Sequence, residues 1–279
     1  MSLVAVTKKE FLDAIRSYTL IGLVAFFTIL TGFWSLIHWI PEMSDPVTGN
    51  LDAIALLNSM RQPALFLIPL VALVVGYKAI AGERESGSIR LLLSLPNSRR
   101  DVLLGKVIGQ TAVVSVAILS GYGVAALIAF LTYDSFSFSV FVIYTLLSIL
   151  YALVCISIAI SVSASTRSLE WAIIGAGAVY LIFIFFWDTV WAVLTVVFVD
   201  NPAKPATHPD WLVALGYMNP STAFAQATRA VLPMTREITA FPLLHTTFWA
   251  DWYGFIVLGL WILIPISLSY ISFSRTDIQ

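Results

Sequence analysis

Charged residues are scarce in this sequence of 279 residues. They make up 11% of the chain, and 59% of the residues are hydrophobic, with a mean hydropathy of +0.91. Soluble domains contain about 25% charged residues, so the composition excludes a water-soluble globular fold. The net charge of −1 hides an uneven distribution of the charges along the chain, and no nucleic-acid partner is expected.

Residues that commonly build catalytic or metal centres are also few. Cys155 is the only cysteine, so the chain cannot form an internal disulfide bond. The histidines, His38, His208 and His245, form no His-x-x-x-His pair, and no paired membrane acids are present to activate water. The methionines and histidines show no tight ligand spacing that would suit copper. We therefore expect no catalytic residues, no metal site and no cofactor on this chain, which is not predicted to be an enzyme.

A nucleotide-binding motif is missing. The phosphate-binding loop has the pattern G-x-x-x-x-G-K-[ST], but Gly105-Lys106 is followed by Val107 and has no glycine five positions upstream. The run L-S-G-Y-G at residues 119–123 superficially resembles an ATPase signature sequence. It lies inside an apolar segment, where small residues favour close helix packing and where no nucleotide can reach it.

Long apolar segments are abundant instead. A membrane-spanning helix needs about 20 apolar residues, and backbone groups in lipid must be hydrogen-bonded within the segment. The second segment reaches this length because Lys78 can extend its ammonium group to the headgroups. The sequence predicts an all-α integral membrane protein with one transmembrane domain over residues 1–279. Its six predicted spans are residues 18–40, 62–81, 107–131, 138–163, 170–190 and 252–273.

Lysine and arginine predict the orientation of these spans. Six spans place both termini on one side of the membrane, together with the loop at residues 82–106. Of the fifteen Lys and Arg residues, eleven lie on that side and four on the other. We therefore expect a multi-pass protein of the plasma membrane with cytoplasmic termini and a cytoplasmic 82–106 loop.

The first sixteen residues are predicted to form an interfacial helix. Apolar side chains at Val4, Phe11, Leu12 and Ile15 fall on one helical face, and the charged side chains lie elsewhere. This periodicity is typical of a helix that lies along the membrane surface. The alternative is a frayed polar terminus.

The segment between the fifth and sixth spans, residues 189–251, is predicted to lie outside. Residues 189–199 are nearly all apolar, although they follow a span that already has full length. Asn219-Pro220 is a typical helix start, with Asn as the cap and Pro at the first helical position, and the helix is expected over 221–232. These pieces either form re-entrant helices at the outer mouth of a path or serve only as packing elements.

The 82–106 loop is the most charged part of the chain. It holds eight of the 31 charged residues in 25 positions, so it cannot lie in lipid. Glu83-Arg84-Glu85 is followed by a short amphipathic segment and a turn at Pro96. A short exposed helix of this kind can bind in a groove of a cytoplasmic partner. The alternative is that the charges only end helices and fix the topology.

The loop also carries a resemblance to a known family. The patterns E-R-E-x-G-S, L-L-L-S-x-P-x-x-R and L-G-K, together with K-K-E-F-x-D-x-I-R near the start and N-P-S-T-A-F in the outer segment, resemble the permease subunits of ABC-2 type transporters. The likeness in length, spans and loop order covers essentially the whole chain. Within the family, the sequence is similar to the permeases that serve nitrous-oxide reductase maturation.

This resemblance implies a permease subunit, with an exporter as the expected direction. A separate cytoplasmic ABC ATPase subunit would bind ATP and magnesium, and a second permease copy would complete a homodimer in the lipid membrane. The resemblance also implies that the 82–106 loop couples to the ATPase. The positions that match the family motif are Glu83, Arg84, Glu85, Gly87, Ser88, Pro96 and Arg99.

Some questions stay open at the level of sequence. A secondary transporter needs buried ion-coupling residues or broken helices, and a membrane scaffold would transport nothing. Asp188 is the sole acid near the interior of a span; it either lines the path or lies at the membrane interface. Gly105 and Gly109, and the serines at 157, 161 and 165, are spaced four apart, which predicts close helix or subunit contacts.

Overall fold

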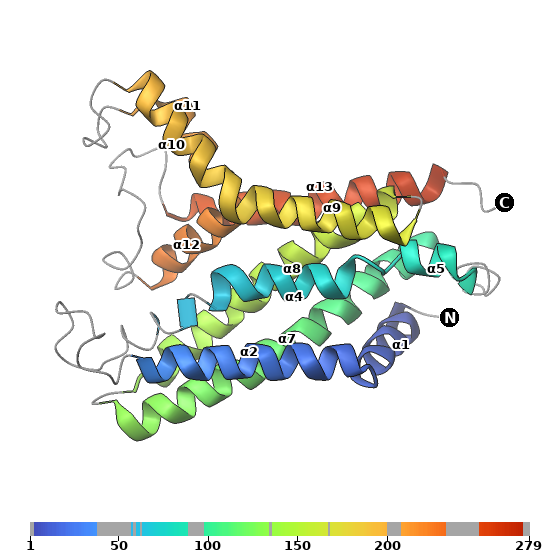
Figure 1. Cartoon of the computed structure of the whole chain (residues 1–279), viewed down its shortest axis with the longest axis horizontal. Helices are drawn as coiled ribbons and strands as arrows, with labels where there is room; N and C mark the ends of the chain where they lie inside the picture. Colours follow the sequence, from blue (N-terminus) through green and yellow to red (C-terminus); the bar gives the residue numbers. More distant parts are fainter. Residues whose placement is uncertain are drawn as a thin grey trace.

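The computed structural model describes residues 3–37, 57, 60–61, 63–88, 98–133, 136–166, 168–199, 208–232 and 251–275. Within these ranges the chain is helical and contains no strand, so the all-α prediction is confirmed. The helices form an elongated bundle in which α1, α5 and both termini lie at one end, and α10, α11 and α12 at the other (Figure 1). The helices are α1 (Leu3–Ile15), α2 (Tyr18–Ile37), η1 (Pro63–Leu67), α4 (Ile68–Gly76), α5 (Ala81–Glu85), α7 (Arg99–Thr132), α8 (Phe138–Ser165), α9 (Leu169–Leu181), η2 (Ile182–Phe186), α10 (Trp187–Phe198), α11 (Asp210–Tyr217), α12 (Pro220–Val231) and α13 (Tyr253–Arg275).

Six helical segments are long and apolar enough to cross a membrane, which confirms the predicted number of spans. The chain is therefore a multi-pass membrane protein. The second span joins η1, α4 and α5, and the fifth joins α9, η2 and α10. In order, the six spans are Tyr18–Leu36, Pro63–Glu85, Arg99–Thr132, Phe138–Ser165, Leu169–Phe198 and Tyr253–Phe273.

The second, third and fourth spans form the centre of the bundle. Within their most apolar windows, 61%, 44% and 61% of the residues are buried, against 6% in the fifth span. Between the third and fourth spans, the Tyr122 hydroxyl lies 3.0 Å from Ser148 Oγ, which satisfies two polar groups where no water is available. The fifth span lies at the outside of a single chain, with most of its apolar surface uncovered.

Helix α7 is longer than the membrane requires. Its 34 residues correspond to about 51 Å at 1.5 Å per residue, against a hydrocarbon thickness of about 30 Å. Ser98 caps its first turn, since Ser98 Oγ accepts a hydrogen bond from the Asp101 N–H at 3.1 Å and donates one to Asp101 Oδ2 at 2.7 Å. The first turns of α7 therefore extend beyond the apolar layer and carry the charges of the loop that precedes them.

The fifth span differs from the sequence prediction. The helix does not end near residue 190 but continues through η2 to Phe198, a total of 30 residues. Residues 189–198 are therefore the end of this span and not a separate outer helix. The physical reason is that the sequence contains neither glycine nor proline from residue 178 through 201, so nothing interrupts the helix.

The predicted helix after Asn219 is confirmed. Asn219 Oδ1 accepts a hydrogen bond from the Ser221 N–H at 2.9 Å, with Pro220 at the first helical position. This helix, α12, packs on α8 and α13: the Phe224 ring stacks on Tyr151 at 4.8 Å between centroids. Asn219 Nδ2 also donates to the Phe183 carbonyl in η2 at 2.9 Å. The segment after the fifth span is thus joined to the bundle, whereas residues 200–207 and 233–250 lie outside the described residues.

Candidate functional site

The ends of the 82–106 loop are the candidate functional site, because the sequence places the coupling motif there. The structure describes the residues up to Ser88 and from Ser98 onward, so Pro96 and the predicted short helix lie outside the described residues. Before the gap, α5 brings Glu83, Arg84 and Glu85 against four other helices, α1, α7, α8 and α9. After it, Arg99 begins α7. Each of these side chains has a definite partner within the chain.

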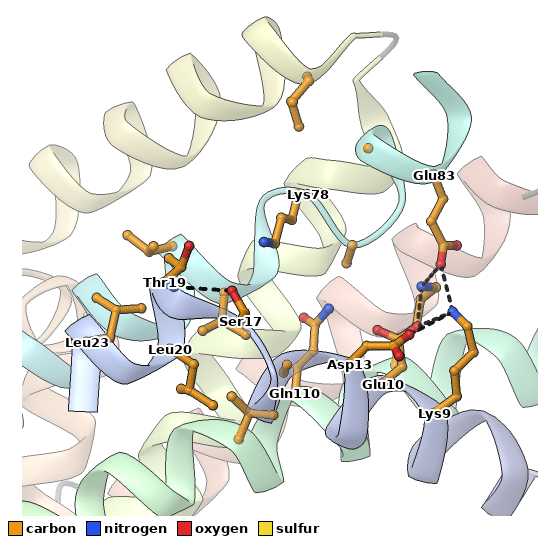
Figure 2. Close-up of a pocket in the computed structure, with 18 residues that line it drawn as sticks. Lys9, Glu10, Asp13, Ser17, Thr19, Leu20, Leu23, Lys78, Glu83 and Gln110 are labelled. Carbon is orange, nitrogen blue, oxygen red and sulfur yellow. Dashed lines mark hydrogen bonds and ion pairs between the residues drawn. The ribbon is translucent and has the colours of Figure 1, made fainter. Parts of the chain in front are cut away.

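Glu83 belongs to a buried ion cluster at the junction of α1, α5 and α7 (Figure 2). The Lys106 ammonium lies 2.7 Å from Glu10 Oε1 and 2.7 Å from Glu83 Oε1. Its side chain is only 1% exposed. A lone ammonium buried to this extent would be strongly destabilising, so the two carboxylates are required to hold it there.

Lys9 closes the cluster on its outer side. Its ammonium lies 3.8 Å from Glu10, 3.6 Å from Asp13 and 3.7 Å from Glu83. Burial lowers the pKa of Lys9, but the carboxylates of Glu10, Glu83 and Asp13 outweigh it and the net shift is upward. The cluster holds two ammonium groups and three carboxylates and is therefore one negative charge in excess.

Two glycines allow this cluster to form. A Cβ atom on Gly105 would lie 2.7 Å from the Val6 Cβ, and one on Gly109 would lie 2.8 Å from the Glu10 Cβ. Distances this short do not occur between real side chains, so α1 can approach α7 only because both positions are glycine. The predicted small face of Gly105 and Gly109 is confirmed, and its partner is α1.

Arg84 and Glu85 hold α5 to the turn between the fourth and fifth spans. Arg84 Nη1 donates to the carbonyls of Ala164 at 3.0 Å and Thr166 at 2.9 Å, at the end of α8, where carbonyl groups lack a donor within the helix. Glu85 Oε2 accepts a hydrogen bond from the Leu169 N–H at 3.0 Å, at the first turn of α9, where a negative charge is favoured. Both side chains therefore stabilise ends of neighbouring helices.

The same end of the fourth span receives the backbone before α5. The N–H groups of Ile80 and Ala81 both donate to Ser163 Oγ, each at 3.0 Å. The turn between α4 and α5 leaves these N–H groups without a helical acceptor, and Ser163 supplies one. With Arg84 and Glu85, this makes a continuous attachment of α5 to the end of the fourth span and the start of the fifth.

Gly87 and Ser88 form the exit from α5. Gly87 has φ +74°, the only positive φ among the described residues, and glycine adopts this conformation without strain. Its N–H bonds to the Arg84 carbonyl at 3.2 Å. Ser88 is exposed, and its hydroxyl lies 2.9 Å from Ser86 Oγ. This turn ends α5.

Arg99 holds the other end of the loop. Its Nη1 donates to the Phe273 carbonyl on α13, and its guanidinium lies 5.5 Å from the centre of the Phe273 ring. The guanidinium of Arg100 lies 5.3 Å from the Tyr270 ring. These contacts combine a charged hydrogen bond with cation–π attraction. The loop thus starts at α5 and ends at α7 with both ends fastened to other spans.

Asp188 lies apart from this site. It is exposed near the start of α10, in the fifth span at the periphery of the bundle, and neither described cavity includes it. In the described part of the chain it makes no ion pair. Its assignment to a path or an interface stays a prediction.

Sequence reasoning did not find Lys106, Glu10 and Lys9 as a cluster. The available signal in the sequence was a lysine directly after Gly105, at the start of a long apolar run. Among the residues that the structure describes, no three His, Cys, Asp or Glu side chains are arranged so that they could hold a metal ion.

Comparison with known proteins agrees with the motif in the loop. Residues 4–278 match the family model described as "ABC-2 family transporter protein". The chain is 35% identical over 122 residues to a protein of Stutzerimonas stutzeri named "Probable ABC transporter permease protein NosY", and equally to the protein of that name in Pseudomonas aeruginosa. The matched region covers 44% of this chain and 43% of each relative, less than half of the relatives' length.

Proposed function

The chain belongs to the ABC-2 transporter family, and from this membership we propose that it is the permease subunit of an ATP-driven exporter. A separate cytoplasmic ABC ATPase binds ATP and magnesium and docks on the 82–106 loop. The permease converts this docking into movement of its spans and thereby moves a substrate across the plasma membrane. The name of the two relatives, which describes them as permease proteins, supports this proposal.

The attachment of both ends of the loop is the observation that carries the proposal. On one side, α5 is bonded to α1 and α7 through Glu83, to the end of α8 through Arg84 and to the start of α9 through Glu85. On the other side, Arg99 is bonded to α13. A force applied to the loop between these points acts on five helices together. The motif residues therefore serve coupling by transmitting force inside the permease, and the loop between its two attached ends provides the contact with the ATPase.

The charge distribution supports cytoplasmic termini. The end of the bundle that holds α1, α5 and the end of α13 (Figure 1) also holds most of the lysines and arginines, as is typical of the cytoplasmic side. The opposite end, with α11 and α12, then faces outward. We infer that α12 covers the outer mouth of the path.

Asp188 on the fifth span supports a homodimer. The span lies at the periphery of the single chain, where only 6% of its apolar window is buried, and Asp188 is exposed there. An acidic side chain in a span is costly in lipid and normally faces protein or water. A second copy packed along this span covers the apolar face and removes Asp188 from lipid.

Site-specific crosslinking tests the docking. In a Cys155→Ala background, Ser88→Cys carries a short crosslinker in membranes that also contain a candidate ABC ATPase subunit. Met218→Cys is the matched control, since Met218 is also exposed (55%) but lies at the opposite end. We expect the ATPase to be captured from Ser88→Cys alone. Equal capture from both positions, or substrate flux in the absence of ATP, would contradict the proposed function.

A further inference from the structure

A cavity of about 370 Å³ lies between α1, α2, the second span and α7. Its volume falls in the range of ligand cavities, about 300–1,000 Å³. Figure 2 shows that Lys78 reaches it from the turn before α5, Glu83 from α5 and Gln110 from α7. Ser17 and Thr19 lie on the side of α2. Residues of the ion cluster line this space, but the contacts described above for the cluster and the loop do not occupy it.

One wall of the cavity has a cation without an anion. Lys78 is exposed and lines the cavity, and its ammonium makes no ion pair or hydrogen bond in the part of the chain that the structure describes. Its ammonium points toward the side where Ser17 and Thr19 lie (Figure 2). An ammonium group offers three donors and no acceptor, and hydroxyl groups beside it add two further donors. This wall suits a phosphate group.

The opposite wall, which the ion cluster of Lys9, Lys106 and Glu83 also lines, has buried acceptor atoms without a hydrogen-bond partner. Gln110 is 5% exposed, extends from α7 into the cavity, and its side-chain oxygen has no hydrogen-bond partner. The second carboxylate oxygen of Glu83, Oε2, is also buried without a hydrogen bond. Unsatisfied buried acceptors of this kind are costly, and the neighbouring ion cluster has one negative charge in excess. This wall suits a group that is positively charged and has several N–H donors.

The cavity continues into apolar surface. Leu20, Leu23, Val74, Val75 and Val113 line the part that lies toward the middle of the spans. The level of the cavity along the bundle is marked by α1, which leaves Val4 and Ile15 exposed (69% and 41%) as an interfacial helix does. The polar walls therefore lie at the headgroups and the apolar part lies in the acyl layer.

We propose that this cavity binds one phospholipid whose headgroup carries a primary ammonium, as phosphatidylethanolamine does. Its phosphate accepts hydrogen bonds from Lys78 and from the hydroxyl groups of Ser17 and Thr19. Its ammonium donates to Gln110 and to the carboxylates of the ion cluster, and its acyl chains lie against the leucines and valines. All residues that line this site belong to one permease chain. Lipid binding can therefore be tested without the ATPase and without a transport assay.

Native mass spectrometry of the purified full chain in mild detergent tests the proposal by titration with phospholipids of one headgroup at a time. We expect one phosphatidylethanolamine to bind, with phosphatidylcholine about tenfold weaker because its quaternary ammonium has no N–H donor. Lys78→Met should weaken phosphatidylethanolamine binding by about tenfold or more, the effect of losing one charged hydrogen bond. Lys78→Arg should retain binding, and Lys8→Met, at an exposed lysine of α1 outside the cavity, should not change it.

A second variant separates the two walls. Gln110→Leu keeps the phosphate wall but removes one acceptor for the ammonium, so it should reduce the difference between the two lipids. The soluble headgroup O-phosphoethanolamine should bind much more weakly than the lipid, because it lacks the acyl chains. The proposal is overturned if Lys78→Met binds phosphatidylethanolamine as the original chain does, if phosphatidylcholine binds equally well, or if the soluble headgroup competes at the same concentration.

Discussion

Replacing Lys106 with methionine tests how the charged junction of α1, α5 and α7 is held. Methionine keeps most of the volume but leaves Glu10 and Glu83 facing each other, 12% and 17% exposed. Removing one partner of a buried ion pair costs about 3–5 kcal/mol. The remaining exposure and the nearby Lys9 reduce the repulsion, so we expect about 3 kcal/mol, the lower end of this range.

The loss is measured as the change in the free energy of unfolding, by denaturant titration in detergent micelles followed by tryptophan fluorescence. At roughly 2–4 °C per kcal/mol, the same loss lowers the Tm by about 6–12 °C. The triple variant Glu10→Gln/Glu83→Gln/Lys106→Met removes all three charges. We expect it to be more stable than Lys106→Met alone, because no unpaired carboxylate stays buried. A cost below about 1 kcal/mol for Lys106→Met, or a triple variant less stable than the single one, would refute this account.

Three further outcomes are expected. Gly109→Ala should destabilise the chain by about 1–3 kcal/mol because its methyl group meets Glu10 on α1. The control Gly123→Ala on the same helix has open space around it and should not destabilise the chain. Equal melting temperatures of the two variants would contradict the close approach of α1. Asn219→Ala should cost about 1–2 kcal/mol through the lost cap and the lost bond to Phe183, and unchanged thermal unfolding would contradict it. Cysteines at Ser98 and Met218 should react with an impermeant reagent from opposite sides of the membrane, and labelling of both from outside would overturn the orientation.

The spans and several local signals could be predicted from the sequence. Apolar length sets the six spans, and Asn219-Pro220 marks the start of α12, because capping depends on a few consecutive residues. Gly105 and Gly109 indicate a close helix contact because residues four apart lie on the same face of a helix. These features are local, so no knowledge of the partner helix is needed to predict them.

The charged site could not be predicted in the same way. Lys106 and Glu10 are 96 positions apart. In the sequence, Lys106 is only one of the eight charged residues of the 82–106 loop. Its burial depends on the position of α1, which is set by packing between distant segments. Likewise, Glu83, Arg84 and Glu85 form a charged run in the sequence, but their partners lie on α1, α7, α8 and α9, and no spacing rule relates these segments.

The π-helical segment η2 indicates how the sequence of the fifth span evolved. A π turn accommodates one residue more than the α turn it replaces, and each residue turns an α-helix by about 100°. The side chains of α10 are therefore rotated by about that angle from the positions that an unbroken continuation of α9 would give them. The Phe183 carbonyl in this segment accepts a hydrogen bond from Asn219. Such a turn is the expected trace of a single-residue insertion between residues 182 and 186. Aligned relatives that lack the insertion should show a one-residue gap at this place, together with a residue other than asparagine at the position of Asn219.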